Sequence, residues 1–496
     1  MAITVLHTPQ EAARWLRARV RGCLHTDSRR VRAGDGFIAW PGAASDGRAF
    51  VAAALAQGAL ACLVEQAGSE RFGFAPDAPV ARYAGLRTAC GPIADAYYEA
   101  PSRALALVAI TGTNGKTSTA WWLAHALSAL RSPALSPCAI VGTLGIGVPP
   151  RLEPTGLTTP DPVRLHAGLR ALVDHGVRAC ALEASSIGLA EHRLDATAIR
   201  VAVFTNFSQD HLDYHDTMAA YWQAKQALFD WPGLQAAVIN IDDPRGDALA
   251  HHAAARGVEV WTVSLQRPAR LRAQDLLWNE RGLHWTVHEA QAEQVVDAAV
   301  VGAYNAANLM GVLGAMRALG VPLADAAAAC AALPAVPGRL ERIEVAGAPL
   351  AIVDYAHTPD ALEQVLRALQ PLAERRAGAL WCVFGCGGNR DAGKRPLMAA
   401  VAERLADRVV VTSDNPRHED PRAIVDAVLA GLARPDAALV EVDRARAIAA
   451  ALAAAQPRDV VLIAGKGHED YQEVAGQRHP FSDQAVARAA LSGARP

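Results

Sequence analysis

The sequence predicts an α/β protein built from three domains, and three observations support this fold class. Alanine-rich helical stretches alternate with short Val, Ile and Leu runs along most of the chain, which is typical of parallel sheets covered by helices. The 496 residues are too many for one hydrophobic core. An apolar strand near residues 105–111 runs directly into a glycine-rich turn, which is typical of a P-loop-type parallel sheet.

Two short segments rich in helix-breaking residues give the expected domain boundaries. They are Ala-Pro-Ser at residues 100–102 and Leu-Pro-Ala-Val-Pro-Gly at residues 333–338. We therefore expect a small N-terminal α/β domain, a central P-loop-type parallel-sheet domain and a C-terminal Rossmann-like α/β domain, over residues 1–103, 104–338 and 339–496. Within the central domain, strands are expected near residues 179–182, 201–204 and 237–241.

Composition restricts the class of protein. Lys and Arg number 48 and Asp and Glu 50, so a net charge of −2 offers no field that would attract nucleic acid or an anionic membrane surface. No basic segment followed by a long apolar run opens the sequence, and no uncharged apolar stretch reaches the roughly 18 residues of a membrane span. We expect a cytoplasmic protein that is not membrane-embedded. The eight cysteines, which form no C-x-x-C pair, are expected to be reduced core thiols.

The stretch LALVAITGTNGKTST at residues 105–119 carries the strongest functional signal. A glycine-rich turn lets backbone N–H groups approach phosphate oxygens, and the helix that follows presents its positive end to them. Lys116 can neutralise phosphate charge and Thr117 can ligate Mg²⁺. The pattern is the shorter form of the P-loop, since Ile110 stands where the full form has glycine. A Gly-Lys-Thr string also occurs in ordinary surface turns, but the flanking strand and helix favour a phosphate site.

Further candidates follow the next strands. Glu183 comes at the carboxyl end of the strand at 179–182, where a second metal-binding acid is expected. The strand at 201–204 ends in an unusually polar segment, in which His211 is either a ligand or a solvated loop histidine. Lys225, in a helical run expected over 219–229, is an ordinary solvated lysine on the residues alone.

Four other polar side chains could hydrogen-bond a phosphate or a sugar, although turn and capping roles explain them equally well. They are Thr158, Thr159, Ser185 and Arg193.

The motifs together resemble one family. TGTNGKT, GLTTPDP, LEASSIGL, FTNFSQDHLDYH, GAYNAANLM, PGRLE and VDYAHTPDAL occur in the order found in Mur ligases, the ATP-dependent amide-forming enzymes of peptidoglycan precursor synthesis. The resemblance implies ATP as co-substrate and Mg²⁺ as cofactor. It also implies that Lys225 is carbamylated to N6-carboxylysine and that Lys116, Lys225 and His211 are catalytic. The implied metal ligands are Thr117, Glu183, His211 and carbamylated Lys225.

The resemblance extends to the nucleotide and sugar contacts. The implied ATP contacts are Gly112, Thr113, Asn114, Gly115, Lys116, Thr117, Ser118, Asn305, Asn308, Arg339 and Asp354, with either Asn305 or Asn308 meeting the adenine. In the first domain, TDSR at residues 26–29 resembles the UDP-binding signature of the tripeptide-forming branch, which makes Ser28 a uridine-nucleotide contact. Thr158, Thr159, Ser185 and Arg193 are expected to complete the UDP-muramoyl site. Arg48 stands where that branch often has histidine.

In the third domain, four polar clusters follow apolar strands that end near residues 353, 384, 412 and 464, which marks a ligand crevice. Arginines there could bind carboxylates and acidic residues could bind ammonium groups, as a diamino diacid requires. DNPR at residues 414–417 resembles the motif of the branch that adds meso-diaminopimelate, and Arg417 would bind the carboxylate that lysine lacks. The expected diaminopimelate contacts are Arg390, Asp414, Asn415, Pro416, Arg417, Gly465 and Glu469.

The activity implied is addition of meso-diaminopimelate to UDP-N-acetylmuramoyl-L-alanyl-D-glutamate through an acyl phosphate, by a protein expected to be a monomer with small-molecule partners. Three alternatives remain open at this point. The same ligase could use lysine, the enzyme could be a folylpolyglutamate synthase, or the chain could be a non-catalytic relative. The first-domain UDP signature disfavours the second alternative. The presence of Lys116, Thr117, Glu183, His211 and Lys225 disfavours the third.

Overall fold

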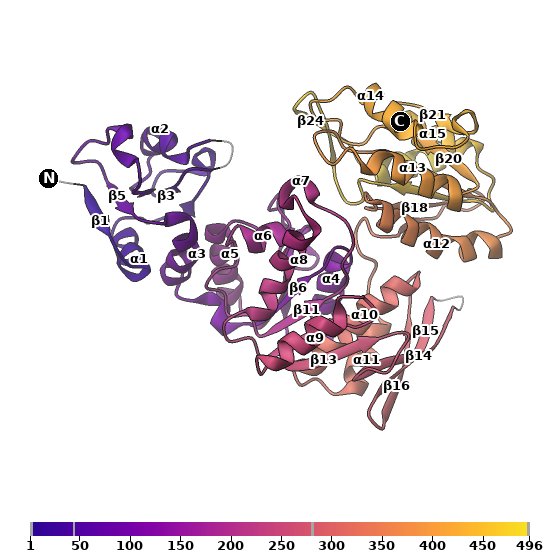
Figure 1. Cartoon of the computed structure of the whole chain (residues 1–496), viewed down its shortest axis with the longest axis horizontal. Coiled ribbons are helices and arrows are strands. Elements are labelled where there is room, and N and C mark those ends of the chain that lie inside the picture. The colour runs from indigo at the N-terminus through magenta and orange to yellow at the C-terminus, as the bar shows by residue number, and fades with distance from the viewer. Residues whose placement is uncertain (1–2, 43–44, 279–281, 494–496) are drawn as a thin grey trace.

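The computed structural model describes residues 3–42, 45–278 and 282–493, and three α/β units follow one another along the chain (Figure 1). Each unit has its own sheet with helices packed on it. The α/β fold class expected from the sequence is confirmed. Within the described residues, no helix has both the length and the apolar character that crossing a membrane requires.

The first unit contains a five-stranded parallel sheet. Its strands in spatial order are β1 (Thr4–Leu6), β5 (Val80–Tyr83), β4 (Ala61–Glu65), β3 (Gly36–Ala39) and β2 (Leu24–His25). Its helices are α1 (Pro9–Arg17), α2 (Val51–Ala56) and α3 (Leu86–Tyr97), with 3₁₀ turns η1 (Ser28–Arg30), η2 (Gly47–Phe50) and η3 (Ser69–Phe72). Helix α1 begins at a capping box in which Thr8 and Glu11 each bind the other's backbone N–H, so the sequence itself fixes where this helix starts.

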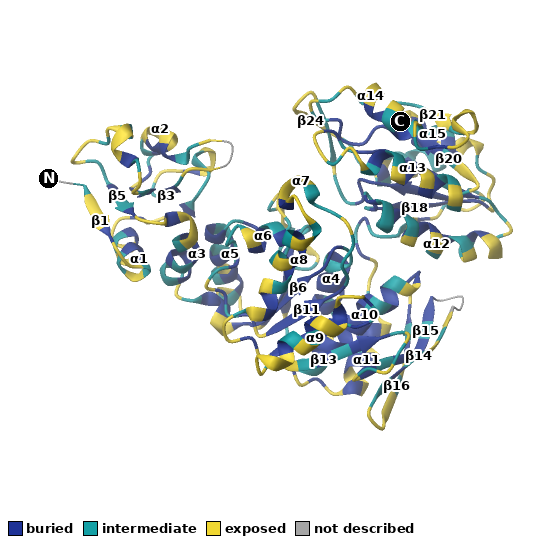
Figure 2. Cartoon of the chain, in the orientation of Figure 1, coloured by how far each residue is buried: buried dark blue, intermediate teal, exposed yellow. Residues whose placement is uncertain are grey.

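The second unit contains an 11-stranded sheet whose centre is parallel. In spatial order the strands are β16 (Ala292–Ala298), β15 (Leu283–Glu289), β14 (Leu271–Trp278), β13 (Glu259–Ser264), β12 (Ala236–Asn240), β11 (Val201–Phe204), β6 (Ala106–Thr111), β10 (Ala179–Glu183), β7 (Cys138–Gly142), β8 (Gly145–Val148) and β9 (Arg151–Glu153). Strands β6, β10 and β11 are buried along their whole length, as strands covered on both faces must be (Figure 2). The strands expected near 179–182, 201–204 and 237–241 are therefore confirmed as β10, β11 and β12.

The helices of this unit cover both faces of the sheet and enclose two apolar cores. They are α4 (Lys116–Ala129), α5 (Pro162–Asp174), α6 (Ser186–Ala190), α7 (Leu212–His215), α8 (Met218–Gln226), α9 (Gly246–Ala255), α10 (Ala303–Ala318) and α11 (Leu323–Ala331), with η4 (Pro101–Ala104) and η5 (Ala227–Asp230). The single helix expected over 219–229 is wrong at its end. The chain tightens into η5 after Gln226 because Trp231, which precedes a proline, cannot continue an α-helix.

The centre of this sheet is parallel, as expected, and its two edges are antiparallel, which the sequence did not predict. At one edge β8 pairs antiparallel with both β7 and β9, and at the other edge β15 pairs antiparallel with both β14 and β16. On β15, Leu283, Trp285 and Val287 are buried while the residues between them are partly exposed. This alternation indicates that one face of the sheet is solvated at this edge. Antiparallel strands commonly tolerate such a face, whereas parallel strands are usually covered on both sides.

The third unit contains a six-stranded sheet that is parallel except at one edge. In spatial order its strands are β17 (Glu341–Ile343), β18 (Leu350–Asp354), β22 (Val460–Ala464), β19 (Leu380–Phe384), β20 (Arg408–Val411) and β21 (Leu439–Val440). Its helices are α12 (Pro359–Arg375), α13 (Lys394–Leu405), α14 (Pro421–Leu429), α15 (Arg444–Ala454) and α16 (Asp483–Leu491), with η6 (Pro435–Ala437) and a separate hairpin of β23 (Tyr471–Val474) and β24 (Gln477–Pro480). Adjacent parallel strands β18, β22, β19 and β20 place the four expected polar clusters along one edge.

The first unit packs on the second through helices α3 and α5, which lie side by side (Figure 1). A Cβ on Gly91 would lie 2.6 Å from the carbonyl oxygen of Asp195, so the two units approach closely at this point. Val163 of α5 belongs to the apolar core of the first unit. This contact fixes the first unit on the central sheet through close packing.

The expectation of reduced core thiols is confirmed for seven of the eight cysteines and wrong for Cys23. All eight are free thiols, and the buried ones are Cys62, Cys90, Cys138, Cys180, Cys330, Cys382 and Cys386. Cys23 is exposed because it lies in the turn that leads into β2 rather than in a strand or helix.

Candidate active site

The phosphate loop connects the carboxyl end of β6 to the first turn of α4, at the sheet edge where β10 and β11 also end. Two of its positions require glycine. A Cβ on Gly112 would lie 1.9 Å from Oγ1 of Thr205, and Gly115 has a φ of +85° with Asn308 Oδ1 only 2.2 Å from where its Cβ would be. The short P-loop pattern therefore forms the turn that the sequence predicts.

The loop is held by Thr205, Asn206 and Ser208 of the polar segment that follows β11, and the sequence had not given these three residues individual roles in the site. The backbone N–H of Asn114 donates to Oδ1 of Asn206 at 2.9 Å, and Thr205 donates its hydroxyl to the Asn114 carbonyl at 2.6 Å. The Asn114 side chain donates to Asp360 of α12 at 3.0 Å, and Ser208 donates to the same carboxylate oxygen at 3.0 Å. Asp360 thus ties the third unit to the phosphate loop.

Two lysines converge on one carbonyl of this loop. Lys116 donates to the oxygen of Gly112 at 2.8 Å, and Lys225 donates to the same oxygen at 2.7 Å. Burial lowers the pKa of Lys116, against the opposing effect of Glu183 and Asp210. The ammonium group of Lys116 beside a helix N-terminus gives the positive charge that a polyphosphate needs.

Lys225 is almost fully buried, with 1% of the residue exposed. Its Nζ lies 4.5 Å from the centre of the Tyr221 ring. Burial above all, and then the charge of Lys116, lower the pKa of Lys225 well below its ordinary value, while Asp210 acts in the opposite direction. A buried lysine with a lowered pKa presents a neutral nucleophilic amine, which is the form that reacts with carbon dioxide.

Glu183 is buried at the end of β10 and faces the phosphate loop. Thr117 donates its hydroxyl to Oε2 of Glu183 at 2.8 Å, and the backbone N–H of Thr143 donates to Oε1 at 2.8 Å. Arg339 in turn approaches the Thr117 hydroxyl, with Nη2 at 3.4 Å. Burial raises the pKa of the Glu183 carboxyl, and the hydrogen bond from Thr143 and the charge of Lys116 partly offset that rise.

The oxygens of Thr117 and Glu183 are hard donors beside a phosphate-binding turn, so their chemistry fits Mg²⁺. His211 lies next to Asp210, with 3.4 Å between Nε2 and Oδ2, and burial lowers its pKa so that the imidazole stays neutral and able to ligate. Across residues 3–42, 45–278 and 282–493, no group of three or more His, Cys, Asp or Glu side chains is close enough to hold a metal. The candidate metal donors therefore lie in two pairs near the phosphate loop, Thr117 with Glu183 and His211 with Asp210.

The two candidates for contact with the adenine, Asn305 and Asn308, lie at the start of α10, and Asp354, expected to contact the nucleotide, lies at the end of β18. Asn308 lies against Gly115 of the loop and donates to Asn305 at 3.2 Å, and Asn305 donates to the Val301 carbonyl at 2.8 Å. Both carboxylate oxygens of Asp354 accept backbone N–H groups, those of Leu340 and Ala356, each at 2.8 Å. Asp354 therefore fixes the backbone at Leu340, the residue next to Arg339.

The residues expected to form the sugar-nucleotide site lie in two units. Thr159 bonds to the Ser185 hydroxyl at 3.0 Å, and Arg193 donates to the Thr159 carbonyl at 2.8 Å, so these three form one cluster at the sheet edge. The hydroxyl of Thr158 instead bonds to that of Thr143 at 3.0 Å. Ser28 begins η1 of the first unit.

Arg48 of the first unit serves a structural role. Its guanidinium is 2% exposed and pairs with Asp46 at 2.7 Å. It also donates to the carbonyls of Ala67 and Glu65 and lies 4.9 Å from the centre of the Phe72 ring. Arginine at this position thus fastens η2 to the end of β4.

In the third unit, the two arginines expected to bind carboxylates flank the ends of β19 and β20. Arg417 has a φ of +53° and donates to the Gly388 carbonyl at 2.8 Å. Arg390 is 56% exposed and reaches Asp213 of the central unit, with 3.6 Å between Nη1 and Oδ2. A guanidinium uses several donors, so each retains N–H groups for a ligand carboxylate.

The acidic and amide members of this cluster are brought together more tightly. Asn415 donates to Glu469 at 2.8 Å, and the backbone N–H of Asn415 donates to Asp414 at 2.6 Å. Gly465 has a φ of +121°, and a Cβ there would lie 2.5 Å from Asp414 Oδ2. Lys466, which sequence reasoning missed although it lies inside the GKGHE cluster, is fully buried between Asn415 and Glu469.

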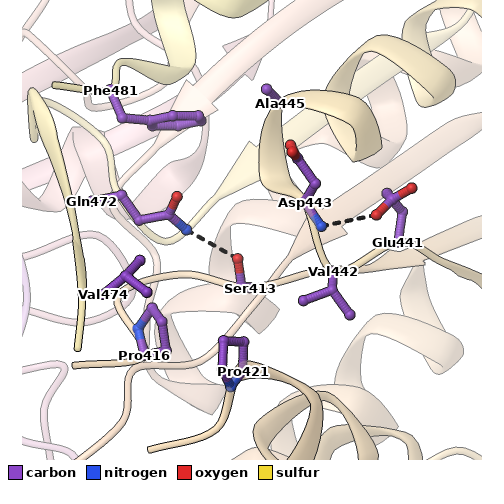
Figure 3. Close-up of a pocket in the computed structure, with 10 residues that line it drawn as sticks. All are labelled: Ser413, Pro416, Pro421, Glu441, Val442, Asp443, Ala445, Gln472, Val474 and Phe481. Carbon is purple, nitrogen blue, oxygen red and sulfur yellow. Dashed lines mark hydrogen bonds between the residues drawn. The ribbon is translucent and has the colours of Figure 1, made fainter. Parts of the chain in front are cut away.

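Behind the DNPR loop, a cavity of about 520 Å³ is lined in part by Pro416, Gln472 and Phe481. Figure 3 shows the Gln472 amide pointing at Ser413, where Nε2 donates to the hydroxyl at 2.9 Å. The same nitrogen donates to the Asp414 carbonyl at 2.6 Å. The hairpin that carries Gln472 therefore supports the DNPR loop from this side.

A parallel sheet with a phosphate loop, paired lysines and a buried carboxylate at one edge defines a P-loop-type nucleotide-binding protein, and a second cluster of charged side chains lies in the third unit. Three family descriptions match the chain: "Mur ligase family, catalytic domain" over residues 22–98, "Mur ligase middle domain" over 110–316 and "Mur ligase, glutamate ligase domain" over 338–467. The chain belongs to the Mur ligase family, as its motifs had indicated.

Relatives of high similarity carry one name. The chain is 61% identical over 494 residues to the UDP-N-acetylmuramoyl-L-alanyl-D-glutamate--2,6-diaminopimelate ligase of Acidovorax sp. (strain JS42), covering 99% of this chain and 98% of the relative. It is 47% identical over 470 residues to the ligase of the same name from Pseudomonas aeruginosa, with 95% and 94% covered. A solved structure of a ligase of that name shares 36% identity at a TM-score of 0.64, covering 95% of this chain and 94% of that one.

Proposed function

We propose that this chain is the ligase that adds meso-diaminopimelate to UDP-N-acetylmuramoyl-L-alanyl-D-glutamate in peptidoglycan precursor synthesis. The observation that carries the proposal is the Arg417-bearing cluster of the third unit, which offers groups for both carboxylates and ammonium ions. The names of the relatives support it. We further propose that the protein is a monomer and that it is cytoplasmic. The location is supported because ATP and UDP-linked precursors are intracellular substrates and the cysteines are free thiols.

The nucleotide in this proposal is ATP, bound at the phosphate loop. Lys116 would contact the phosphates, and Asn308 and Arg339 flank the loop from α10 and from the segment before β17. Thr117 and Glu183 would hold Mg²⁺, and His211 and carbamylated Lys225 would serve a second ion. When bound, these ions would neutralise charge on the transferring phosphoryl group.

The reaction needs no covalent bond to the protein. The D-glutamyl carboxylate attacks the γ-phosphorus, the bond to the bridging oxygen breaks and ADP leaves, which gives an acyl phosphate. The free amine of diaminopimelate then attacks the acyl carbon and inorganic phosphate leaves. The lysine ammonium of Lys116 stabilises the charge that develops on the phosphoryl oxygens.

Selection of the amino acid is assigned to the third unit. Arg417 and Arg390 would bind carboxylates, and Asp414 and Glu469 would accept hydrogen bonds from an ammonium group. Lysine has no distal carboxylate, so it would leave Arg417 without its partner, and an unpaired guanidinium disfavours binding.

The sugar nucleotide is assigned to the first unit and the adjoining sheet edge, with Ser28 on the uridine side and the cluster of Thr158, Thr159, Ser185 and Arg193 toward the reacting end. We propose domain boundaries at residues 1–103, 104–338 and 339–496. The main sheet of each unit lies within one of these segments, which supports the proposal.

Phosphate release from ATP and Mg²⁺ tests the proposed function. The purified chain is incubated with the UDP-muramoyl dipeptide and meso-diaminopimelate, lysine or no amino acid. Release that depends on diaminopimelate is expected. Release with lysine instead would overturn the selectivity. A separate arm contains folate and glutamate in place of the dipeptide and amino acid, and release there would indicate a folylpolyglutamate synthase. No release in any arm would indicate a non-catalytic relative.

A further inference from the structure

The side chain of Lys466 has no access to solvent. The chain has only four lysines, at positions 116, 225, 394 and 466, and arginines make up the rest of its Lys and Arg total. The Lys466 side chain is 0% exposed and immediately follows the end of β22 in the loop at 465–469. Lysine is almost never fully buried unless it is paired, so its neighbours account for its presence.

Its partners are two residues already placed in the amino-acid site. Lys466 Nζ lies 2.9 Å from Oε2 of Glu469 and 3.1 Å from Oδ1 of Asn415. Asn415 in turn donates its Nδ2 to Oε2 of Glu469 at 2.8 Å. The three side chains form a closed triangle of hydrogen bonds, and such charge-assisted bonds are the strong ones.

The triangle uses up most of the hydrogen-bonding capacity of Asn415. Its Oδ1 accepts from Lys466 and also from the backbone N–H of Glu473 at 2.9 Å, which fills both lone pairs. One hydrogen of its amide is held by Glu469. Asn415 therefore acts mainly as a support whose amide orientation is fixed by Lys466.

The triangle also sets which oxygen of Glu469 faces a ligand. Oε2 accepts from both Lys466 and Asn415, whereas Oε1 accepts no hydrogen bond from the part of the chain that the structure describes. An ammonium group of the amino acid would therefore meet Oε1. A carboxylate held at one oxygen in this way is pre-oriented, which lowers the entropy lost when the ligand binds.

The triangle connects two loops that are not neighbours in the sheet. The loop at 413–417 follows β20 and the loop at 465–469 follows β22, and β19 lies between these strands. Lys466 spans this separation from inside the domain. Without it, the side-chain connection between the loops within this triangle would be the bond from Asn415 to Glu469 alone.

We propose that Lys466 is a positioning residue of the amino-acid site, which fixes Glu469 and Asn415 for the ammonium group of meso-diaminopimelate. The proposal rests on the proposed function, because it assumes that this site takes the diamino acid. Lys466 lies behind the two residues and acts through them. Its loss should affect binding of the amino acid and should leave binding of ATP unchanged.

The test compares Lys466→Met and Lys466→Gln with the parent chain in the phosphate-release assay. For Lys466→Met we expect the KM for meso-diaminopimelate to rise roughly 10- to 100-fold, with the KM for ATP and kcat little changed. Lys466→Gln, whose amide can still donate to Asn415 or Glu469, should recover part of the loss. Arg478→Met is the matched control, since Arg478 is 64% exposed and pairs with Glu473 outside the triangle.

A double-mutant cycle with Glu469→Gln separates positioning from general damage. If Lys466 acts through Glu469, adding Lys466→Met to Glu469→Gln should raise the KM little further. Additive effects, or a KM unchanged in Lys466→Met, would overturn the proposal. If Lys466→Met does not fold, the double variant, which leaves no carboxylate unpaired, is compared with Glu469→Gln alone by the same criterion. A parent chain without diaminopimelate-dependent release would instead refute the proposed function.

Discussion

Arg444 and Asp483 form a bidentate ion pair in which both side chains are 0% exposed. Nε and Nη2 of the arginine each lie 2.7 Å from a carboxylate oxygen. The remaining donors of the guanidinium reach the carbonyls of Ser413 at 3.1 Å and Ala464 at 2.9 Å, where β20 and β22 end. Through these two carbonyls, the buried pair holds the two loops that carry the proposed amino-acid site.

Breaking this pair should destabilise the third unit. Arg444→Met leaves Asp483 as a buried charge without its partner, and we expect the free energy of unfolding to fall by about 3–5 kcal/mol. The urea unfolding transition of the third unit measures it. Arg422→Met, which breaks an exposed pair with Asp426, should change it by less than about 1 kcal/mol. If the two substitutions lowered the free energy of unfolding equally, burial of the Arg444–Asp483 pair would not be the source of its contribution to stability.

Lys225 should be essential for turnover as a carbamate. Lys225→Ala and Lys225→Arg are expected to lose about 10²- to 10³-fold in kcat, and added bicarbonate should not restore either. Lys225→Glu, which supplies carboxylate oxygens, should retain more activity than Lys225→Ala. Because the pKa of Lys225 is lowered, the reactive neutral amine is already present near neutral pH, and the carbamate should decline as the pH falls.

The carbamate itself can be observed with ¹³C-labelled bicarbonate. A carbamate carbon signal is expected in the parent chain and should be absent from Lys225→Ala. Full activity of Lys225→Arg, which cannot form a carbamate under these conditions, would rule out the assignment.

Arg417 should determine affinity for the diamino acid. Arg417→Ala is expected to raise the KM for meso-diaminopimelate by roughly 10- to 100-fold and to leave the KM for ATP nearly unchanged, because the guanidinium lies away from the phosphate loop and contacts Gly388. Steady-state kinetics in each substrate measure both constants. Arg422→Ala serves as a nearby exposed control. An unaltered KM for diaminopimelate would remove Arg417 from the site.

His166 should make stability depend on pH. It lies at the joint between the first two units, with Nε2 3.2 Å from the Asp195 carbonyl and Nδ1 3.5 Å from Asp95. Burial lowers the pKa of His166 to about 4. The unfolded chain therefore binds the extra proton between about pH 6.5 and 4, so stability is full above this range and falls by up to about 3 kcal/mol through it.

Denaturation midpoints at about pH 7 and about pH 5 check this expectation. His166→Gln can still donate to Asp195 but does not titrate, so its midpoint should change less between the two pH values. Burial raises the pKa of Asp95, so the titration of this carboxyl increases stability as the pH falls, opposite to the effect of His166. The variant Asp95→Asn removes this contribution and so separates the two effects. Parallel pH dependence in the parent chain and His166→Gln would exclude His166 as the source.

The fold was largely predictable because its central strands are continuous apolar runs, as β6 and β10 illustrate. The antiparallel edges were missed although β15 alternates buried and exposed residues, which is the signature of a sheet with one wet face. Cys23 was misjudged because its exposure depends on the packing of a turn, which composition does not report.

The site was predictable where its chemistry is local in sequence. The phosphate loop and the acid at the end of β10 could be found because each comes at the end of an apolar strand. The contact of Lys466 with Asn415 joins residues 51 positions apart, and that of Asn114 with Asp360 joins residues 246 apart. Pairings of this kind depend on which strands become neighbours, which a single sequence does not state.

The buried lysine of the amino-acid site alters its overall charge. Three cationic side chains, Arg390, Arg417 and Lys466, stand against two anionic ones, Asp414 and Glu469, which leaves one formal positive charge in excess. Diaminopimelate with its attacking amine unprotonated carries one negative charge, whereas lysine in the same state is neutral. With the site as proposed, the preference for the diacid would reside in the field of the whole cluster as well as in one contact, and it should weaken as ionic strength rises.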